Sequence, residues 1–349
     1  MSINVNEIFK VMETIGVKQV IFQGPPGTSK THGAKELIKS VMSENTTDEE
    51  LKECKLTLQQ YESKRLPDGK RVFWDMVQFH PSYSYEDFVR GITVETEDSK
   101  KTVTYRTINK IFGSICELAA ENDNNGNDKI FFLIIDEINR ADVATVFGEL
   151  IYALEYRNHD IATPYKVEKT NERNIKVPDN LYIIGTMNTA DKSVGTIDMA
   201  IRRRFLFVDL LPEEKIIIKH FEEKNGDESW ESLRDGTIKC FEALKEIVSS
   251  SIKGTYKAKD FQIGHTYFLP DFSKVKSAED AKQVIQYKLM YQVLPMLREY
   301  TEDRILDSKN IAIEKTIGDV VSLIADLKEY LEGSDKKVNE IAEKLINLG

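Results

Sequence analysis

The stretch Val17-Lys18-Gln19-Val20-Ile21-Phe22-Gln23-Gly24-Pro25-Pro26-Gly27-Thr28-Ser29-Lys30-Thr31 decides the fold of this 349-residue chain. Its short apolar run, Val20 to Phe22, predicts a buried strand, and a loop rich in glycine and proline follows. Lys30 and Thr31 then open a segment whose apolar residues have helical spacing. The order strand, loop, helix is the context in which such a loop cradles a polyphosphate on its backbone N–H groups.

This loop is predicted to bind a nucleotide and a metal ion. Lys30 would reach the β- and γ-phosphates, and Thr31 would place its hydroxyl on Mg²⁺. The binding residues are expected to be Gly24, Pro25, Pro26, Gly27, Thr28, Ser29, Lys30 and Thr31. Ser29 departs from the pattern G-x-x-x-x-G-K-[ST], and a Cβ at this tight turn is expected to weaken affinity. Taken alone, the loop could also be an ordinary glycine–proline turn.

The amino-acid composition indicates which class of protein this is. Hydrophobic residues make up 41% and charged residues 30% of the chain, as in ordinary globular proteins, and the net charge is −10. An acidic chain has no bulk attraction to nucleic acid, so such a contact needs a local basic patch or a partner. Three widely spaced cysteines fit a reducing compartment. With no signal peptide or membrane-spanning run expected, we predict a cytoplasmic protein without a membrane partner.

A second group of candidate residues follows the apolar run at 130–135. A continuous apolar run predicts a strand buried on both faces of a parallel sheet, and ligands bind at the carboxyl ends of such strands. Asp136 suits coordination of Mg²⁺, and Glu137 suits orientation of an attacking water. The alternative is that the two acids only cap the next helix, but with a phosphate loop upstream the catalytic interpretation is favoured.

Two further segments supply candidate catalytic residues. The predicted strand 181–188 ends in Asn188, which could hydrogen-bond the attacking water or the γ-phosphate. After a short helix comes the run of three arginines that includes Arg203 and Arg204. The run could be a solvated helix end. It could also hold an arginine finger, which stabilises charge on a transferring phosphoryl group and often comes from a neighbouring subunit.

The remaining chain is expected to alternate strands and helices and then to become helical. We predict helices over 3–16, 105–120 and 213–225, one helix from Val143 to Leu154, and longer helices over 228–252 and 278–300. A strand is expected over 72–79, a hairpin over 92–104, and a polar, partly helical, solvent-facing insertion over 43–71. The predicted domains are an α/β domain (1–212), a smaller helical domain (213–306) and a helical extension (307–349).

Taken together, the motifs resemble the AAA+ superfamily, and more narrowly the McrB family of restriction motor subunits. The resemblance spans about residues 15–305, in the family's order. It rests on the phosphate loop and on the following stretches: 78–88, Ile135-Asp136-Glu137-Ile138-Asn139-Arg140-Ala141, 146–149, Met187-Asn188-Thr189-Ala190-Asp191, 200–205, and the lid motif Ile263-Gly264-His265-Thr266-Tyr267-Phe268. The signature motif adds Asp191 to the catalytic candidates, and the lid motif adds His265 to the binding candidates.

The resemblance implies an AAA+ P-loop NTPase with a parallel sheet flanked by helices and a helical lid. It implies a hexameric ring that uses Mg²⁺, prefers GTP to ATP, moves along DNA and activates an McrC-like endonuclease. Lys192 stands where the signature has arginine, which keeps the charge but loses the bidentate fork. The phosphate loop begins early, so we expect DNA selection to lie in another subunit or another domain, or to be absent. Two alternatives are a nucleotide-dependent assembly switch with little turnover and a MoxR-like ATPase chaperone.

Overall fold

The computed structural model describes residues 5–97, 102–123, 129–167, 171–191, 197–224, 226–313, 320–335 and 337–348. The chain forms two compact units. The first comprises Met1–Gln23 and Lys30–Asp209, and the second comprises Gly24–Ser29 and Leu210–Gly349. The loop that precedes Lys30 therefore packs with the C-terminal unit. Lys192, singled out from the sequence, lies outside the described residues.

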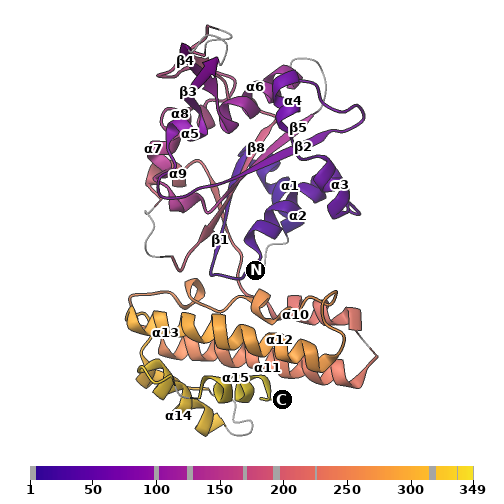
Figure 1. The fold of residues 1–349 in the computed structure, drawn as a ribbon, viewed down its shortest axis with the longest axis vertical. Helices are drawn as coiled ribbons and strands as arrows, with labels where there is room; N and C mark the ends of the chain where they lie inside the picture. Colours follow the sequence, from indigo (N-terminus) through magenta and orange to yellow (C-terminus); the bar gives the residue numbers. More distant parts are fainter. Residues whose placement is uncertain are drawn as a thin grey trace. The chain divides into compact units, whose positions relative to one another are not determined.

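The first unit is built on a parallel sheet (Figure 1). Within the described residues this sheet has five strands, in the order β2 (Val72–Gln78), β5 (Ile130–Asp136), β8 (Leu181–Asn188), β1 (Gln19–Gly24) and β9 (Leu206–Asp209). Gln78 pairs with Asp136, and Ile135 pairs with Gly185. The register therefore brings the carboxyl ends of β5 and β8 together, and the predicted fold class is confirmed.

Helices cover both faces of the sheet because β5 is apolar on both sides. Phe132 faces α1 (Val5–Ile15), where Phe9 packs against it, and α2 (Lys30–Met42) contacts the same sheet. Phe131, Leu133 and Ile135 belong to a core that includes α6 (Ile111–Asp123), α7 (Val143–Phe147) and α8 (Leu150–Glu155). Burial of these strand residues is complete, which accounts for the continuous apolar run in the sequence.

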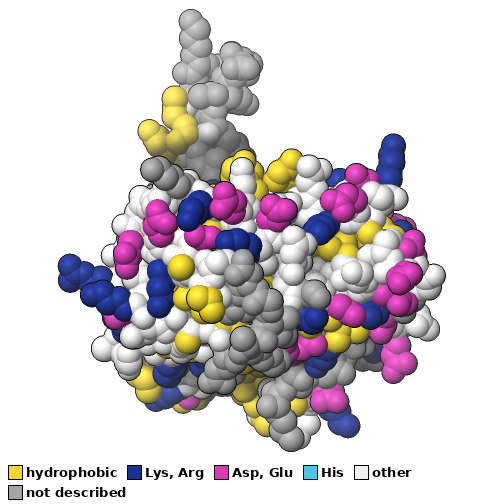
Figure 2. Space-filling model, turned by 90° about the horizontal axis from the view of Figure 1, so that it is seen from below, with side chains coloured by type: hydrophobic (Ala, Val, Ile, Leu, Met, Phe, Trp, Pro, Cys, Tyr) yellow, Lys and Arg dark blue, Asp and Glu magenta, His cyan; other side chains and the backbone are white. Residues whose placement is uncertain are grey.

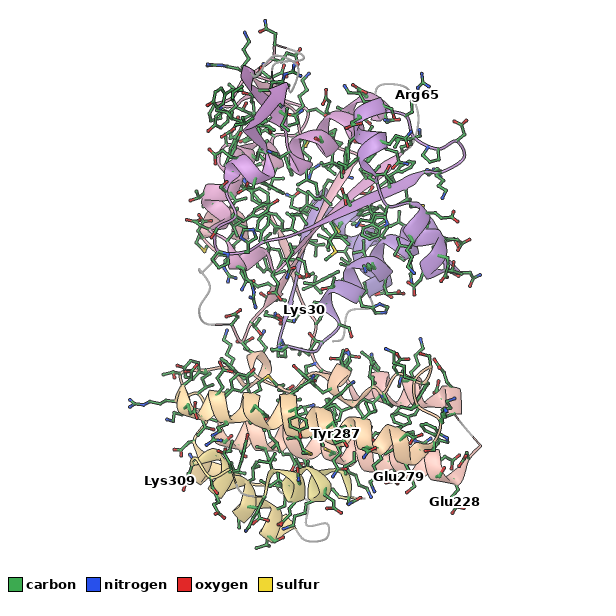
Figure 3. All side chains as sticks on the ribbon, in the orientation of Figure 1. Lys30, Arg65, Glu228, Glu279, Tyr287 and Lys309 are labelled. Carbon is green, nitrogen blue, oxygen red and sulfur yellow. The ribbon has the colours of Figure 1, made fainter. Side chains whose placement is uncertain are left out.

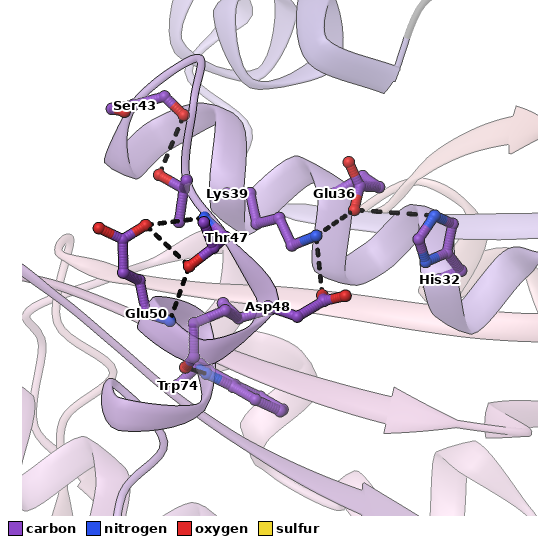
Figure 4. A network of polar contacts seen from close by, with 10 residues as sticks. His32, Glu36, Lys39, Ser43, Thr47, Asp48, Glu50 and Trp74 are labelled. Carbon is purple, nitrogen blue, oxygen red and sulfur yellow. Dashed lines mark hydrogen bonds and ion pairs between the residues drawn. The ribbon is translucent and has the colours of Figure 1, made fainter. Parts of the chain in front are cut away.

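The 43–71 insertion is docked on the sheet rather than freely solvated (Figure 4). Its helices are α3 (Asp48–Glu53) and α4 (Leu58–Ser63). The Lys39 ammonium bridges Glu36 and Asp48 at 2.7 and 2.8 Å. Trp74 of β2 donates its indole N–H to Leu51 and exchanges backbone hydrogen bonds with residues 54 and 56. The insertion thus covers the exposed edge of β2, a position that proteins commonly protect.

Two predicted helices differ from the structure. Residues 105–109 belong to β4 (Thr102–Asn109), which pairs with β3 (Arg90–Glu97), so α6 begins only at Ile111. Cross-strand pairing overrides the apolar spacing there. The single helix predicted from Val143 to Leu154 is interrupted at Gly148, whose φ of 50° ends α7 before α8 begins. The short helix α5 (Tyr85–Phe88) is capped by Ser84, whose hydroxyl accepts a hydrogen bond from the Asp87 N–H. A small sheet pairs β6 (Ile161–Ala162) with β7 (Asn174–Ile175).

The second unit is helical. In the described residues it contains α10 (Glu214–Phe221), α11 (Glu228–Ser251), α12 (Ala278–Lys288), α13 (Leu294–Glu302), α14 (Val320–Leu331) and α15 (Val338–Ile346). A π-helical turn over Leu289–Val293 joins α12 to α13, where Pro295 lacks the N–H for a regular helix. Helix α15 packs on α11 and α12. Among the described helices, none has both the length and the apolar character needed to cross a bilayer.

Candidate nucleotide site

The start of α2 and the end of β5 meet in the first unit. The Thr31 hydroxyl donates to Asp136 Oδ1 at 2.7 Å, and the Thr186 hydroxyl donates to the same oxygen at 2.7 Å. Lys30, labelled in Figure 3, is the first residue of α2 and is 8% exposed. Burial lowers the pKa of Lys30 to about 8, and the neighbouring Glu137 and Asp136 carboxylates oppose that shift.

The Glu137 carboxylate is held by groups from two segments. Asn188 at the end of β8 donates its side-chain N–H to Oε1 at 2.5 Å. Arg140, in the turn after β5, lies 3.5 Å from Oε2. Within the described structure Oε2 is buried and accepts no hydrogen bond. Burial raises the pKa of Glu137, Arg140 acts against this, and Asp136 adds to it.

A second ion pair connects Asp191 to this group. Arg140 Nη2 lies 3.2 Å from Asp191 Oδ2, and the Asn139 side chain donates to the Asn188 carbonyl at 3.3 Å. The structure therefore brings Asp191 and Asn188 next to Glu137. Sequence reasoning assigned no role to Arg140 or Thr186. The sequence features that point to them are that Arg140 is a cation three residues after Glu137 and that Thr186 carries a hydroxyl near the end of an otherwise apolar strand.

The three arginines of α9 (Met199–Arg202) and the residues after it have different surroundings. Arg202 donates to the Ile197 carbonyl at 3.3 Å and lies over the Phe207 ring. Arg204 donates to the Ala200 carbonyl at 2.9 Å and pairs with Glu155 at 2.5 Å. Arg203 is exposed, and no partner for its side chain occurs among the described residues. In the described structure Arg203 is thus exposed, whereas Arg204 is engaged within its own chain.

In the second unit, the loop before Lys30 packs against the lid motif. Ser29 Oγ lies 3.1 Å from His265 Nε2, and the Thr266 N–H donates to the Gly27 carbonyl at 3.1 Å. A Cβ on Gly264 would lie 2.1 Å from the Gly27 carbonyl carbon, so only glycine fits. The positive φ values of Gly27 and Ser29, 77° and 59°, mark the turns of the loop. The predicted binding residue His265 thus contacts the loop itself.

The residues of the first unit fit a magnesium–polyphosphate ligand. Thr31 and Asp136 supply a hydroxyl and a carboxylate, the hard oxygen ligands that Mg²⁺ prefers, and would hold the ion together with phosphate and water oxygens. No group of three or more acid, histidine or cysteine side chains forms a metal cage in the described residues. The unsatisfied Oε2 of Glu137 offers an acceptor to a water molecule.

Comparisons with known proteins agree with this geometry. A family model of the AAA domain (dynein-related subfamily) matches residues 19–205, and one of the McrB α-helical lid domain matches residues 239–309. The type IV methyl-directed restriction enzyme EcoKMcrB subunit of Escherichia coli K12 is 34% identical over 291 residues, which are 82% of this chain and 54% of that protein. The chain therefore spans about half the length of that relative.

A second relative is the type II restriction enzyme BsuMI component YdiS of Bacillus subtilis 168. It is 25% identical over 282 residues, covering 70% of this chain and 71% of that protein. The alignment with the solved structure of C. elegans PCH-2 covers 97% of this chain and 65% of the PCH-2 chain, at 14% sequence identity. Its TM-score is 0.33, so the two structures are not closely similar. On the family matches and the site geometry, this chain belongs to the AAA domain family, dynein-related subfamily, and carries an McrB-type lid.

Proposed function

We propose that this chain binds a nucleoside triphosphate with Mg²⁺ and hydrolyses it as the motor subunit of an McrB-like restriction system. One observation carries the proposal. The Thr31 hydroxyl and the Asp136 carboxylate are hydrogen-bonded beside Lys30, while Asn188 holds Glu137 next to them. This is the set of groups that phosphoryl transfer by P-loop enzymes requires.

Each group has a separate task in the proposed reaction. Thr31 and Asp136 would hold Mg²⁺, which neutralises charge on the β- and γ-phosphates. Lys30 would bind the same phosphates. Glu137 would orient a water on the γ-phosphorus: a P–O bond forms to water, the bond to the β-phosphate oxygen breaks, and the products are the diphosphate and phosphate. Asn188 and Arg140 act through Glu137 by fixing the direction of its carboxylate.

We propose Arg203 as the arginine finger and a hexameric ring as the active assembly. Arg203 is exposed and unpaired among the described residues, as a group that acts on a neighbouring site must be. Large exposed side chains lie on or directly after α8 and α9: Tyr152, Tyr156 and Met199 are 51%, 43% and 70% exposed. The ion pair between Arg204, which follows α9, and Glu155 of α8 connects the two segments. Such a surface suits contact with a second copy of this chain.

The partner and DNA roles are also part of the proposal. By likeness to restriction components, we propose that an McrC-like endonuclease subunit binds the ring and that DNA contact occurs through the complex or a separate recognition subunit. On the face drawn in Figure 2, the described basic side chains are interspersed with acidic and apolar ones. Together with the net charge of −10, this favours DNA capture through a partner.

Three measurements test the proposed function. Phosphate release from Mg²⁺–GTP and Mg²⁺–ATP would establish hydrolysis, and competition binding would test the proposed preference for GTP. Faster and tighter use of ATP would contradict that preference without harming the motor proposal. Affinity purification from the native host would then test the partner. Recovery of a nuclease that stimulates turnover supports the proposal, whereas nucleotide-dependent assembly without turnover supports a switch, and recovery of protein clients alone supports a MoxR-like chaperone.

A further inference from the structure

Ser29 adopts a backbone conformation that favours glycine. Its φ is 59°, and it directly precedes Lys30. The left-handed conformation is strained for a residue with a Cβ. A side-chain hydrogen bond made in this conformation can offset that strain. The Ser29 Oγ lies 3.1 Å from His265 Nε2 within the same compact unit.

The surroundings of His265 determine which of the two groups donates. His265 is buried, with 1% of its surface exposed. The backbone N–H of Glu213 donates to its Nδ1 at 3.4 Å. A neutral imidazole that accepts at Nδ1 carries its proton on Nε2. The Nε2–H therefore donates to Ser29 Oγ.

The segment that carries His265 is itself firmly attached. Lys288 of α12 donates to the carbonyls of Leu269 and Thr266 at 2.8 and 3.2 Å. The Thr266 N–H in turn donates to the Gly27 carbonyl. The lid motif and the loop are thus joined by a backbone hydrogen bond, by the Ser29–His265 hydrogen bond, and by the close backbone approach at Gly264.

We propose that Ser29 and His265 form a positioning pair for the phosphate loop. The hydrogen bond from His265 holds Ser29 in the left-handed conformation that glycine adopts unaided, so the loop N–H groups keep the orientation that phosphate binding needs. This inference rests on the proposed nucleotide binding. The Cβ of Ser29 strains the loop backbone, and its hydroxyl compensates by accepting a hydrogen bond from His265 of the lid motif.

The test is a double-mutant cycle on the full chain, read as the Kd of Mg²⁺–GTP and Mg²⁺–ATP by titration calorimetry. Ser29→Ala keeps the strain and loses the hydrogen bond, whereas Ser29→Gly removes both. His265→Asn keeps an acceptor near the position of Nδ1 but does not reach Ser29, and His265→Gln places an amide donor near the position of Nε2. Circular dichroism melting confirms that each variant is folded.

We expect Ser29→Ala and His265→Asn each to raise Kd about tenfold, which equals about 1.4 kcal/mol. Ser29→Gly should stay within about threefold of the unmodified chain, and His265→Gln should recover part of the loss. In the Ser29→Gly background, His265→Asn should have little further effect, because the partner is gone. KM should rise with kcat unchanged, since neither side chain touches the reacting atoms.

Equal effects of His265→Asn in both backgrounds would overturn the pair, as would a Ser29→Ala variant that binds like the unmodified chain. If His265→Asn does not fold, the Kd values of Ser29→Ala and Ser29→Gly still test the positioning pair. Ser29 is only partly buried, so both of these variants are expected to fold. Lys30→Ala is the reference for lost binding. If the unmodified chain binds neither nucleotide, the proposed function is contradicted. If it binds nucleotide normally but the effects of the Ser29 and His265 substitutions on Kd simply add, only the positioning pair is contradicted.

Discussion

The two carboxylates at the end of β5 differ because their neighbours differ. Asp136 Oδ1 accepts hydrogen bonds from the hydroxyls of Thr31 and Thr186, which fix the carboxylate beside the start of α2. Glu137 instead faces an amide and a guanidinium, and one of its oxygens accepts no hydrogen bond in the described structure. We therefore propose separate tasks for these two adjacent acids.

The first residue-scale prediction separates these tasks. Glu137→Gln keeps the hydrogen-bonding shape but loses the charge that orients water, so nucleotide binding should persist while hydrolysis falls about a hundredfold. Asp136→Asn should instead weaken Mg²⁺-dependent binding, since the metal loses a charged ligand. Binding titrations and single-turnover rates distinguish the two variants. Hydrolysis at the normal rate by the Glu137→Gln chain would refute its assignment.

The second residue-scale prediction compares neighbouring arginines. Arg203→Ala should keep the melting temperature and nucleotide affinity but lower hydrolysis by about 10³-fold or more, as removal of an arginine finger does. Arg204→Ala should lower stability by about 1–2 kcal/mol, because it breaks the bonds to Ala200 and Glu155. Thermal melts and turnover of both variants provide the comparison. A large stability loss in Arg203→Ala would argue against an exposed, unpaired side chain.

At the scale of elements, the lid motif depends on a close backbone approach. A Cβ on Gly264 would lie 2.1 Å from backbone atoms of Gly27, so Gly264→Ala must displace the loop. We expect a nucleotide Kd at least about tenfold higher and a lower melting temperature. Gly254→Ala is the matched control in the same unit, because nothing lies within 4 Å of its added Cβ. Equal behaviour of the two variants would show that the loop and motif do not pack as described.

The helices α14 and α15 are connected by a charged cluster with a definite pH dependence. The ammonium groups of Lys337 and Lys344 donate to Asp326 at 2.7 and 2.6 Å and lower the pKa of that carboxyl. A lowered folded-state pKa contributes stability above the unfolded value, about 3.9, and this contribution is lost as pH falls through the folded value.

Asp326→Asn should therefore reduce the free energy of unfolding at pH 7 by up to about 1 kcal/mol, with the difference shrinking below about pH 4. Urea unfolding followed by circular dichroism at several pH values measures this. Asp335→Asn, which removes an exposed partner of Arg298, is the control and should change less. A difference from the unmodified chain that persists unchanged in acid would exclude the proposed charge interaction.

At the scale of the whole molecule, the finger proposal makes hydrolysis depend on assembly. A single chain would carry Lys30, Asp136 and Glu137, with Arg203 serving a neighbour. The hydrolysis rate should then rise more steeply than linearly with protein concentration, so that specific activity increases until rings are complete. Mixing Arg203→Ala with Glu137→Gln should recover activity, because some interfaces pair an intact Glu137 with an intact Arg203. Each variant alone is the control, and constant specific activity down to a demonstrated monomer would exclude a finger that acts in trans.

Prediction from the sequence succeeded where one local signal was sufficient. The apolar run 130–135 was long enough to specify a buried parallel strand. It failed where local signals competed with pairing. Residues 105–109 have helix-like spacing but become β4, because β3 offers a complete set of hydrogen bonds. The insertion looked solvated, yet Lys39 and Trp74 attach it to the sheet.

The sequence by itself determined the chemistry available to this protein: a phosphate loop, two acids after a buried strand, an amide at the next strand and an arginine run, all recognisable from residue type and spacing. Only the tertiary structure decided how these groups pair. It joined Asn188 to Glu137, occupied Arg204 with Glu155 while leaving Arg203 exposed, and placed His265 on Ser29. The physical reason is that spacing along the chain reports local backbone geometry, whereas pairing depends on how strands, helices and loops pack, which brings together residues 49 to 236 positions apart.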